Sequence, residues 1–231
     1  MNGRLIKSFF RRLLLNNKFV VKLLTRKFNR EYARSSDYWE THYLNDGNSG
    51  SGSFGNRARY KAKIVNTFVA GHDIKTVMEF GCGDGNLLKL LHFPCYIGMD
   101  VSPAALKKCE SIFKGDSTRN FFLYDRECFP GPARMPFEEA ELVLSLDVIF
   151  HLLEDDVFED HMFRLFAAAT RFVIIYAWNV EGKQNKHVKH RKFSSWVSRR
   201  IKGWKLLQKI ENKGPGIADF FIYSKEAVNV N

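Results

Sequence analysis

The residues of this chain that are best placed to do chemistry lie in a glycine-rich turn and in an acid that follows it. Residues 77–88 read VMEFGCGDGNLL, an apolar strand followed by a glycine at every second position. A second apolar segment, residues 96–99, ends on Asp100. Glycines permit a sharp turn and let backbone N–H groups approach a ligand, while a carboxylate can accept two hydroxyl donors. In open α/β sheets such groups meet in a crevice at the carboxyl ends of the strands. The sequence therefore predicts half of a nucleotide-type binding site.

The spacing of the glycines narrows the choice of nucleotide. The pattern is Glu79-x-Gly81-x-Gly83-x-Gly85, whereas the dinucleotide fingerprint has its third glycine one position later, where Asn86 stands. The observed spacing resembles the first motif of the class I S-adenosylmethionine-dependent methyltransferases. We therefore expect S-adenosylmethionine as the cofactor and regard an NAD-dependent oxidoreductase as a weaker alternative.

The resemblance to this family implies a set of cofactor contacts. The glycine turn would hold the methionine portion, and Asp100 would bind both ribose hydroxyls. Asp125, which closes the expected strand before it, would contact the adenine amine, although an ordinary turn acid is an equally good interpretation there. The complete set of expected cofactor-binding residues is Glu79, Gly81, Cys82, Gly83, Gly85, Asp100, Val101, Asp125 and Leu146.

A second segment, residues 144–152, resembles the fourth motif of the same family, where the end of a strand borders both cofactor and substrate. Asp147 would stand at the strand tip and His151 about one helical turn later. The Asn/Asp-Pro-Pro-aromatic signature of base N-methyltransferases does not occur here. A hydroxyl acceptor would need a general base, and histidine is suited to that role near neutral pH. The candidate catalytic residues are therefore Asp147, His151, His187 and His190. The alternatives are a hydrogen-bonded histidine at the sheet edge for His151 and a solvated basic loop for the other two histidines.

A wider likeness covers roughly residues 37–225. Tyr38-Trp39-Glu40, residues 147–152, the run 187–193 and Trp196 together resemble a bacterial methyltransferase group whose members often accompany cell-surface polysaccharide enzymes. The resemblance implies O-methylation of a small or glycan-type acceptor. The alternatives are an RNA or protein methyltransferase that uses the basic amino-terminal tail, and a membrane-associated scaffold that binds the donor without turnover.

Strands alternate with helices along the chain, which indicates a mostly parallel sheet covered on both faces. The fold class that we expect is α/β: a Rossmann-like class I methyltransferase fold with a mostly parallel seven-stranded sheet, helices on both faces and an antiparallel C-terminal strand. The expected strands span 75–80, 96–99, 120–124, 141–146, 171–176, 204–210 and 219–223, and the expected helices span 57–69, 86–91, 103–113 and 155–169.

The segment 45–56, NDGNSGSGSFGN, is too rich in glycine and serine for regular structure. It could be a flexible linker. It could instead fold over the cofactor, because its small residues allow close backbone approach to a ligand. The sequence leaves both interpretations open.

The net charge of +11 is concentrated in the amino-terminal tail. Residues 1–35 contain ten basic side chains and one acid, so the remaining 196 residues carry only +2. Apolar residues recur in the tail every three to four positions, the period of one helical face. The tail could bind an anionic membrane surface, pack on the domain or serve as a transit peptide. We therefore predict a basic amphipathic extension over 1–35 and a catalytic domain over 36–231.

These patterns also set expectations for partners and location. No run approaches the roughly 18 apolar residues of a membrane span, so we expect a cytoplasmic protein that could bind the inner face of the membrane peripherally. A near-neutral domain without a known RNA-binding module makes nucleic acid an unlikely partner. Four scattered cysteines without a Cys-x-x-Cys pair argue against a zinc site or a disulfide framework. The oligomeric state stays open.

Overall fold

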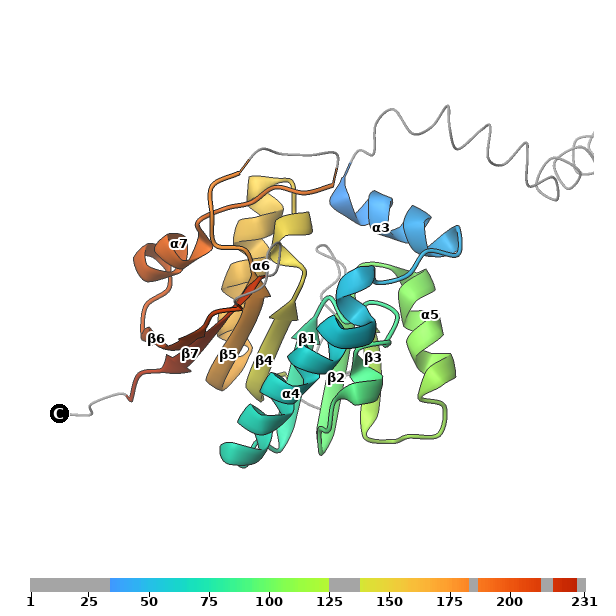
Figure 1. Ribbon diagram of the computed structural model, residues 1–231, viewed down its shortest axis with the longest axis horizontal. Coiled ribbons are helices and arrows are strands. Elements are labelled where there is room, and N and C mark those ends of the chain that lie inside the picture. The colour runs from blue at the N-terminus through green and yellow to red at the C-terminus, as the bar shows by residue number, and fades with distance from the viewer. Residues whose placement is uncertain (1–33, 125–137, 183–186, 213–217, 228–231) are drawn as a thin grey trace, which may run out of the picture. The chain divides into compact units, whose positions relative to one another are not determined.

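The computed structural model describes residues 34–124, 138–182, 187–212 and 218–227 (Figure 1). The chain divides into two compact units, residues 1–34 and 35–231. The predicted amphipathic extension lies almost entirely outside the described residues, and its proposed membrane role stays a prediction. Among the helices that are described, none is long and apolar enough to cross a membrane.

Seven strands form one sheet in the order β3-β2-β1-β4-β5-β7-β6. The first five strands in this order are parallel, while β7 runs antiparallel to both β5 and β6. The order reverses between β1 and β4, the position at which open α/β sheets bind ligands. The predicted fold class is confirmed. The strands are β1 (Thr76–Phe80), β2 (Cys95–Asp100), β3 (Arg119–Leu123), β4 (Ala140–Leu146), β5 (Ala169–Ala177), β6 (Trp204–Ile210) and β7 (Asp219–Lys225).

Helices cover both faces of the sheet (Figure 1). The α-helices are α3 (Ser35–Leu44), α4 (Gly55–Gly71), α5 (Pro103–Ile112), α6 (Asp155–Ala167) and α7 (Phe193–Arg200), and three short 3-10 helices are η1 (Ser51–Ser53), η2 (Leu88–Leu90) and η3 (Ile149–His151). Because side chains alternate along a strand, β1 sends Val77 into the core beneath α4 and Met78 into the core beneath α6 and α7. The inner parallel strands β1, β2 and β4 are therefore buried on both sides, as their continuous apolar runs predict, while the edge strand β3 is only half-buried.

The helix expected over residues 86–91 is wrong: only the 3-10 turn η2 forms there. Residues 81–85 are used by the glycine turn, and Pro94 disfavours a helical conformation at Phe93. Too few residues remain for an α-helix of ordinary length. The turn is closed instead by short-range bonds such as Leu90 N–H to Leu87 O at 2.9 Å. No α-helix N-terminus therefore follows the glycine turn.

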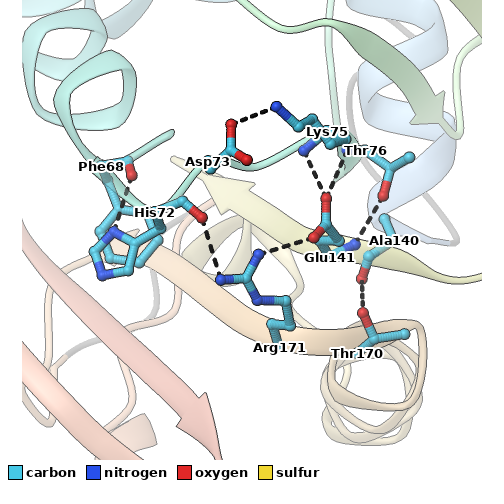
Figure 2. Close-up of polar contacts among 9 residues, drawn as sticks. All are labelled: Phe68, His72, Asp73, Lys75, Thr76, Ala140, Glu141, Thr170 and Arg171. Carbon is cyan, nitrogen blue, oxygen red and sulfur yellow. Dashed lines mark hydrogen bonds and ion pairs between the residues drawn. The ribbon is translucent and has the colours of Figure 1, made fainter. Parts of the chain in front are cut away.

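At the amino-terminal ends of the parallel strands, opposite the glycine turn, Glu141 at the start of β4 makes several polar contacts (Figure 2). Its carboxylate accepts the Lys75 N–H at 2.6 Å and pairs with Arg171 at 2.8 Å. Arg171 also donates to the His72 carbonyl oxygen at 3.1 Å, and Thr76 Oγ1 accepts the Glu141 N–H at 3.0 Å. These contacts join the end of α4 to β1, β4 and β5, so the strands that carry the site share one rigid base.

Candidate functional site

The glycine turn is anchored to the end of β2. The N–H groups of Gly81 and Cys82 both donate to the Met99 carbonyl oxygen, at 2.7 and 3.0 Å. The Gly83 N–H donates to Asp100 Oδ2 at 2.9 Å. Gly81 and Gly83 have φ angles of +86° and +60°, a backbone region in which only glycine is unstrained. The sequence therefore folds this segment into a tight loop that lies directly beside Asp100.

Asp100 ends β2 and is almost fully buried. Oδ1 accepts the Ser102 N–H at 2.9 Å, and Oδ2 accepts the Gly83 N–H. Burial raises the pKa of the carboxyl to about 6, although these N–H groups and that of Val101 oppose the shift. A carboxylate offers about four acceptor positions, so both oxygens keep capacity for further donors. This arrangement fits a ligand with two adjacent hydroxyl groups.

Other expected cofactor residues support the turn from below. Glu79 is buried in β1, and its Oε2 accepts the Tyr96 hydroxyl at 2.6 Å. Burial raises the Glu79 pKa to about 7, against the opposing effects of Tyr96 and Lys61. Leu146 is also buried, at the end of β4. Glu79 therefore contributes a buried acid beneath the turn and presents no exposed carboxylate to a ligand.

The remaining expected cofactor residues have different surroundings. Gly85 approaches the side chain of Cys109 on α5 so closely that a Cβ would lie 3.0 Å from Sγ. Cys82 is half-buried, and the nearby Cys109 thiol, followed by burial, raises the Cys82 pKa well above its ordinary value. Val101 is half-buried just after β2. Asp125 lies outside the described residues, so its expected adenine contact stays a prediction.

Helix α3, whose sequence has no helical apolar pattern, lies at the carboxyl ends of the parallel strands (Figure 1). At its start, Ser35 donates to both Glu154 carboxylate oxygens at 2.8 Å, from N–H and from Oγ. Further along, Glu40 Oε2 accepts the Ser102 hydroxyl at 2.5 Å and the Ala104 N–H at 3.2 Å. Because Glu154 precedes α6 and Ser102 precedes α5, α3 bridges these two helices above the glycine turn.

The Gly/Ser segment after α3 folds onto the glycine turn. The Ser49 Oγ donates to Asp84 Oδ1 at 2.7 Å, and the Ser49 N–H donates to Asp84 Oδ2 at 3.1 Å. The Tyr43 hydroxyl lies 2.9 Å from Ser49 Oγ. A Cβ at Gly83 would lie 2.3 Å from Ser49 Oγ, so any larger residue at Gly83 would displace the segment. These contacts favour the interpretation as a cover for the binding site over that as a flexible linker.

Asp147 stands at the tip of β4, as expected, and has an unexpected partner. Lys61, in the middle of α4, is only 1% exposed, and its Nζ lies 2.5 Å from Asp147 Oδ2. Lys61 was missed because the helix periodicity was assigned from its apolar residues alone. The signal was present, since position 61 follows Ala58 by three residues and precedes Val65 by four, on the face that α4 buries.

The structure gathers the candidate histidines around His151, at the end of η3. His151 Nδ1 lies 2.8 Å from the His187 carbonyl oxygen, and the two rings stack with their centres 5.9 Å apart. Burial, followed by the charges that His187, His190 and His42 would carry, lowers the pKa of His151 to about 4, although the bond to the His187 carbonyl opposes this. Among the described residues, no group of His, Cys, Asp and Glu could hold a metal ion.

The hydrogen bond to His187 also defines the tautomer of His151. A carbonyl oxygen only accepts, so Nδ1 must carry the proton, and a neutral ring then has its lone pair on Nε2. With a pKa of about 4, the ring is neutral at physiological pH. His151 therefore has the protonation state of a general base.

The other two candidate histidines contact aromatic rings in this arrangement, and their catalytic roles stay a prediction. The His187 ring stacks on Tyr38 of α3 with a centre-to-centre distance of 5.3 Å. His190 lies against Trp178 and Phe150, with ring centres 5.2 and 6.0 Å apart. His187 and His190 thus border the site beside His151, and both contact aromatic rings on neighbouring elements.

Two of the cations near these histidines, Lys189 and Arg191, are bound by protein groups. Lys189 Nζ and Arg191 Nη2 lie 2.7 and 2.8 Å from Asp155 Oδ1. Arg191 also donates to the carbonyl oxygens of Leu152 and Leu153 at 2.7 and 3.0 Å. Both cations therefore fasten this segment to the start of α6.

Comparisons with known proteins agree with this architecture. No family model and no curated protein matches the sequence significantly. In contrast, many solved structures share the fold. The N-methyltransferase NodS from Bradyrhizobium japonicum, solved with S-adenosyl-L-homocysteine, superposes with a TM-score of 0.67 at 12% identity, over 84% of this chain and all of NodS. The fold is that of the Rossmann-like methyltransferases.

Two further neighbours are also methyltransferases. A magnesium protoporphyrin IX methyltransferase from Synechocystis, solved with S-adenosylmethionine, has a TM-score of 0.59 at 13% identity, over 85% of this chain and 100% of the neighbour. An amino pentose methyltransferase from Micromonospora echinaspora has a TM-score of 0.58 at 12% identity, over 75% of this chain and 93% of the neighbour. At these identities the likeness establishes the Rossmann-like methyltransferase fold, and the function must be argued from the site.

Proposed function

We propose that this chain is an S-adenosylmethionine-dependent methyltransferase that methylates an oxygen atom of a small or glycan-type acceptor. The observation that carries the proposal is the Asp100 carboxylate, fixed against the glycine turn by the Gly83 N–H with acceptor capacity left on both oxygens. Bound S-adenosylmethionine would supply an electrophilic methyl group. The fold neighbours that are solved with this donor or its demethylated product support the same ligand.

The residues of the chain would mainly position the reactants and exclude water. Methyl transfer is a displacement whose rate depends on alignment of the two reacting groups. The cover formed by α3 and residues 45–56 is attached to the glycine turn through Ser49 and Asp84. His151, neutral at physiological pH, would accept the proton of a hydroxyl acceptor at Nε2, and its pKa of about 4 makes it a weaker general base than an ordinary histidine.

Three observations support a small or glycan-type acceptor. Aromatic rings from Tyr38 and Trp39 lie beside His187 and His151, with centre-to-centre distances of 5.3 and 4.8 Å. Flat apolar surfaces of this kind suit the ring of a small acceptor. The cations Lys189 and Arg191, which could have bound a polyanion, are paired with Asp155 instead. Two fold neighbours are named for an amino pentose and a porphyrin as substrates.

A transfer assay with methyl-tritiated S-adenosylmethionine tests the proposal. The purified chain is incubated with pooled nucleotide sugars, glycan intermediates, RNA and a protein extract as separate acceptors. We expect label transfer in a carbohydrate pool, loss of transfer in Asp100→Asn, and slower transfer in His151→Gln. Asp116→Asn, at an exposed turn before β3, is the matched control and should keep full activity. Label only in RNA or protein would contradict the proposed acceptor, and transfer that survives Asp100→Asn would contradict the proposed donor site.

A further inference from the structure

Lys61 is a charged side chain within an otherwise apolar helix face. The buried face of α4 consists of Ala58, Lys61, Ala62, Val65, Phe68 and Val69. The ammonium of Lys61 reaches Asp147 Oδ2 at the end of β4 and lies 5.4 Å from the centre of the Tyr176 ring on β5. Burying an ammonium group is strongly unfavourable unless it is paired. Lys61, which is 1% exposed, therefore requires the Asp147 carboxylate as its partner.

The backbone of Asp147 is fixed as firmly as its side chain. Its φ angle is +61°, which costs a non-glycine residue on the order of 1 kcal/mol or more. The Asp147 N–H donates to the Tyr176 carbonyl oxygen at 3.0 Å. The side chain remains 23% exposed. The strained backbone thus presents a carboxylate at the open edge of the sheet, and Lys61 determines its direction.

The position of this carboxylate relates it to the donor site. The Val148 side chain lies against Gly81, where a Cβ would be 2.5 Å from Val148 Cγ2. In the order β2-β1-β4, Asp100 and Asp147 end the two strands that flank β1 and its glycine turn, so about two strand spacings, roughly 10 Å, separate them. From above, Gly52 of the cover approaches Asp147 so closely that a Cβ would be 2.5 Å from Oδ2.

We propose that Lys61 is a positioning residue that holds the Asp147 carboxylate at the methyl-transfer end of the donor site, so that the pair distinguishes the cationic donor from its neutral product. The inference rests on the proposed function. A donor whose ribose is bound at Asp100 would extend its sulfonium end across the glycine turn toward Asp147. There the carboxylate favours a positive charge, and Lys61 limits that preference so that the demethylated product and the donor can exchange.

Two ligands that differ in charge at the reacting centre test this proposal without an acceptor. S-adenosylhomocysteine has a neutral thioether there, whereas sinefungin has a carbon that bears a protonated amine. Each is titrated by calorimetry into the wild type and the variants Lys61→Met, Asp147→Asn and Lys61→Met/Asp147→Asn. The measured quantity is the ratio of the sinefungin affinity to the S-adenosylhomocysteine affinity.

A unit charge a few ångströms from the reacting centre in a partly buried site changes this ratio by on the order of tenfold. We expect the ratio to rise about tenfold in Lys61→Met and to fall about tenfold in Asp147→Asn. The double variant removes both charges, leaves neither partner buried and unpaired, and should return the ratio to within about threefold of the wild type. Lys63→Met, an exposed site on the same helix, is the matched control and should leave the ratio unchanged.

The outcomes separate this inference from the function on which it rests. A purely structural ion pair would weaken both ligands equally, so an unchanged ratio in every variant, with wild-type binding intact, would overturn the role of Lys61 and Asp147 alone. If the wild type binds neither ligand, the donor site itself is refuted. Where Lys61→Met does not fold, Asp147→Asn decides alone, because its amide oxygen can still accept a hydrogen bond from Lys61. A fall of the ratio by less than threefold in Asp147→Asn would overturn the proposal, and a larger fall would support it.

Discussion

Replacing Glu79 by glutamine should change how stability depends on pH, because Glu79 is an acid buried beneath the glycine turn. The folded state holds its carboxyl at a pKa of about 7, whereas the ordinary value is 4.5. The folded state therefore binds the proton more tightly than the unfolded chain, and ionisation of Glu79 destabilises the fold as the pH rises from 4.5 through 7. Glutamine resembles the protonated carboxyl and can still accept the Tyr96 hydroxyl.

The size of the effect follows from the two pKa values. A rise from 4.5 to about 7 corresponds to about 3.4 kcal/mol once Glu79 is fully ionised. By linkage, about 1.4 kcal/mol of this cost is already present at pH 5.5, and nearly all of it is present at pH 8.5. Between these two pH values, Glu79 should therefore remove about 2 kcal/mol of stability from the wild type and none from Glu79→Gln.

Urea unfolding at pH 5.5 and 8.5 measures this difference in both proteins. His151 and His161 titrate with the opposite sign and Asp100 with the same sign. Both proteins contain all three groups, so the difference between the proteins reports Glu79 together with its interaction with Asp100. We expect Glu79→Gln to gain about 2 kcal/mol over the wild type between pH 5.5 and 8.5. The same change in unfolding free energy for both proteins would refute the conclusion that burial raises the Glu79 pKa.

Three further predictions concern the cover, the core and the opposite edge of the sheet. Ser49→Ala removes the hydroxyl that binds Asp84. The S-adenosylhomocysteine dissociation constant should rise about tenfold, and the free energy of unfolding in urea should fall by about 1–3 kcal/mol. Unchanged binding would show that the cover does not act on the donor site. His161 is hydrogen-bonded to Ser145 in the core, and burial lowers its pKa from 6.5 to about 4. The unfolded chain therefore takes up a proton first as the pH falls, and the free energy of unfolding should decrease by about 1.4 kcal/mol between pH 8 and pH 5.5. His161→Gln should lack this decrease. At Glu141, the Lys75 N–H is the main group that lowers the pKa below 4.5. Glu141→Gln should therefore melt at a lower temperature than the wild type at pH 7, and this difference in melting temperature should vanish as the pH falls through the folded pKa of Glu141. A difference that persists in acid would contradict this.

Much of the fold could be predicted from the sequence, because its parallel strands are apolar on both faces and alternate with amphipathic helices. The glycine turn and Asp100 were also predictable, because the glycine spacing and an acid at the end of the next strand are visible in a short stretch of sequence. Helix α3 could not be predicted in this way. Its sequence, SSDYWETHYL, has no apolar stripe, and its contacts at Ser35 and Glu40 are with residues more than 60 positions away.

In the candidate site, too, features set by neighbouring residues were predictable, and contacts between distant segments were not. The position of Asp147 at the tip of β4 was predicted from the sequence, whereas its partner, Lys61, lies 86 positions earlier on α4. The helix expected after the glycine turn was wrong because helical propensity does not account for the shortness of the loop between β1 and β2. The tautomer of His151 depends on the carbonyl of His187, which only the folded chain brings within 2.8 Å, and its lowered pKa results mainly from burial in the folded chain.

The donor site can be tested by calorimetric titration of the purified chain with S-adenosylhomocysteine, with NAD as the comparison ligand. We expect one site per chain with a micromolar or tighter dissociation constant for S-adenosylhomocysteine, a loss of affinity of at least 30-fold in Asp100→Asn, and no heat with NAD. Absence of S-adenosylhomocysteine binding in a folded protein, or equal binding by Asp100→Asn, would contradict the assignment of the glycine turn and Asp100 as a donor site.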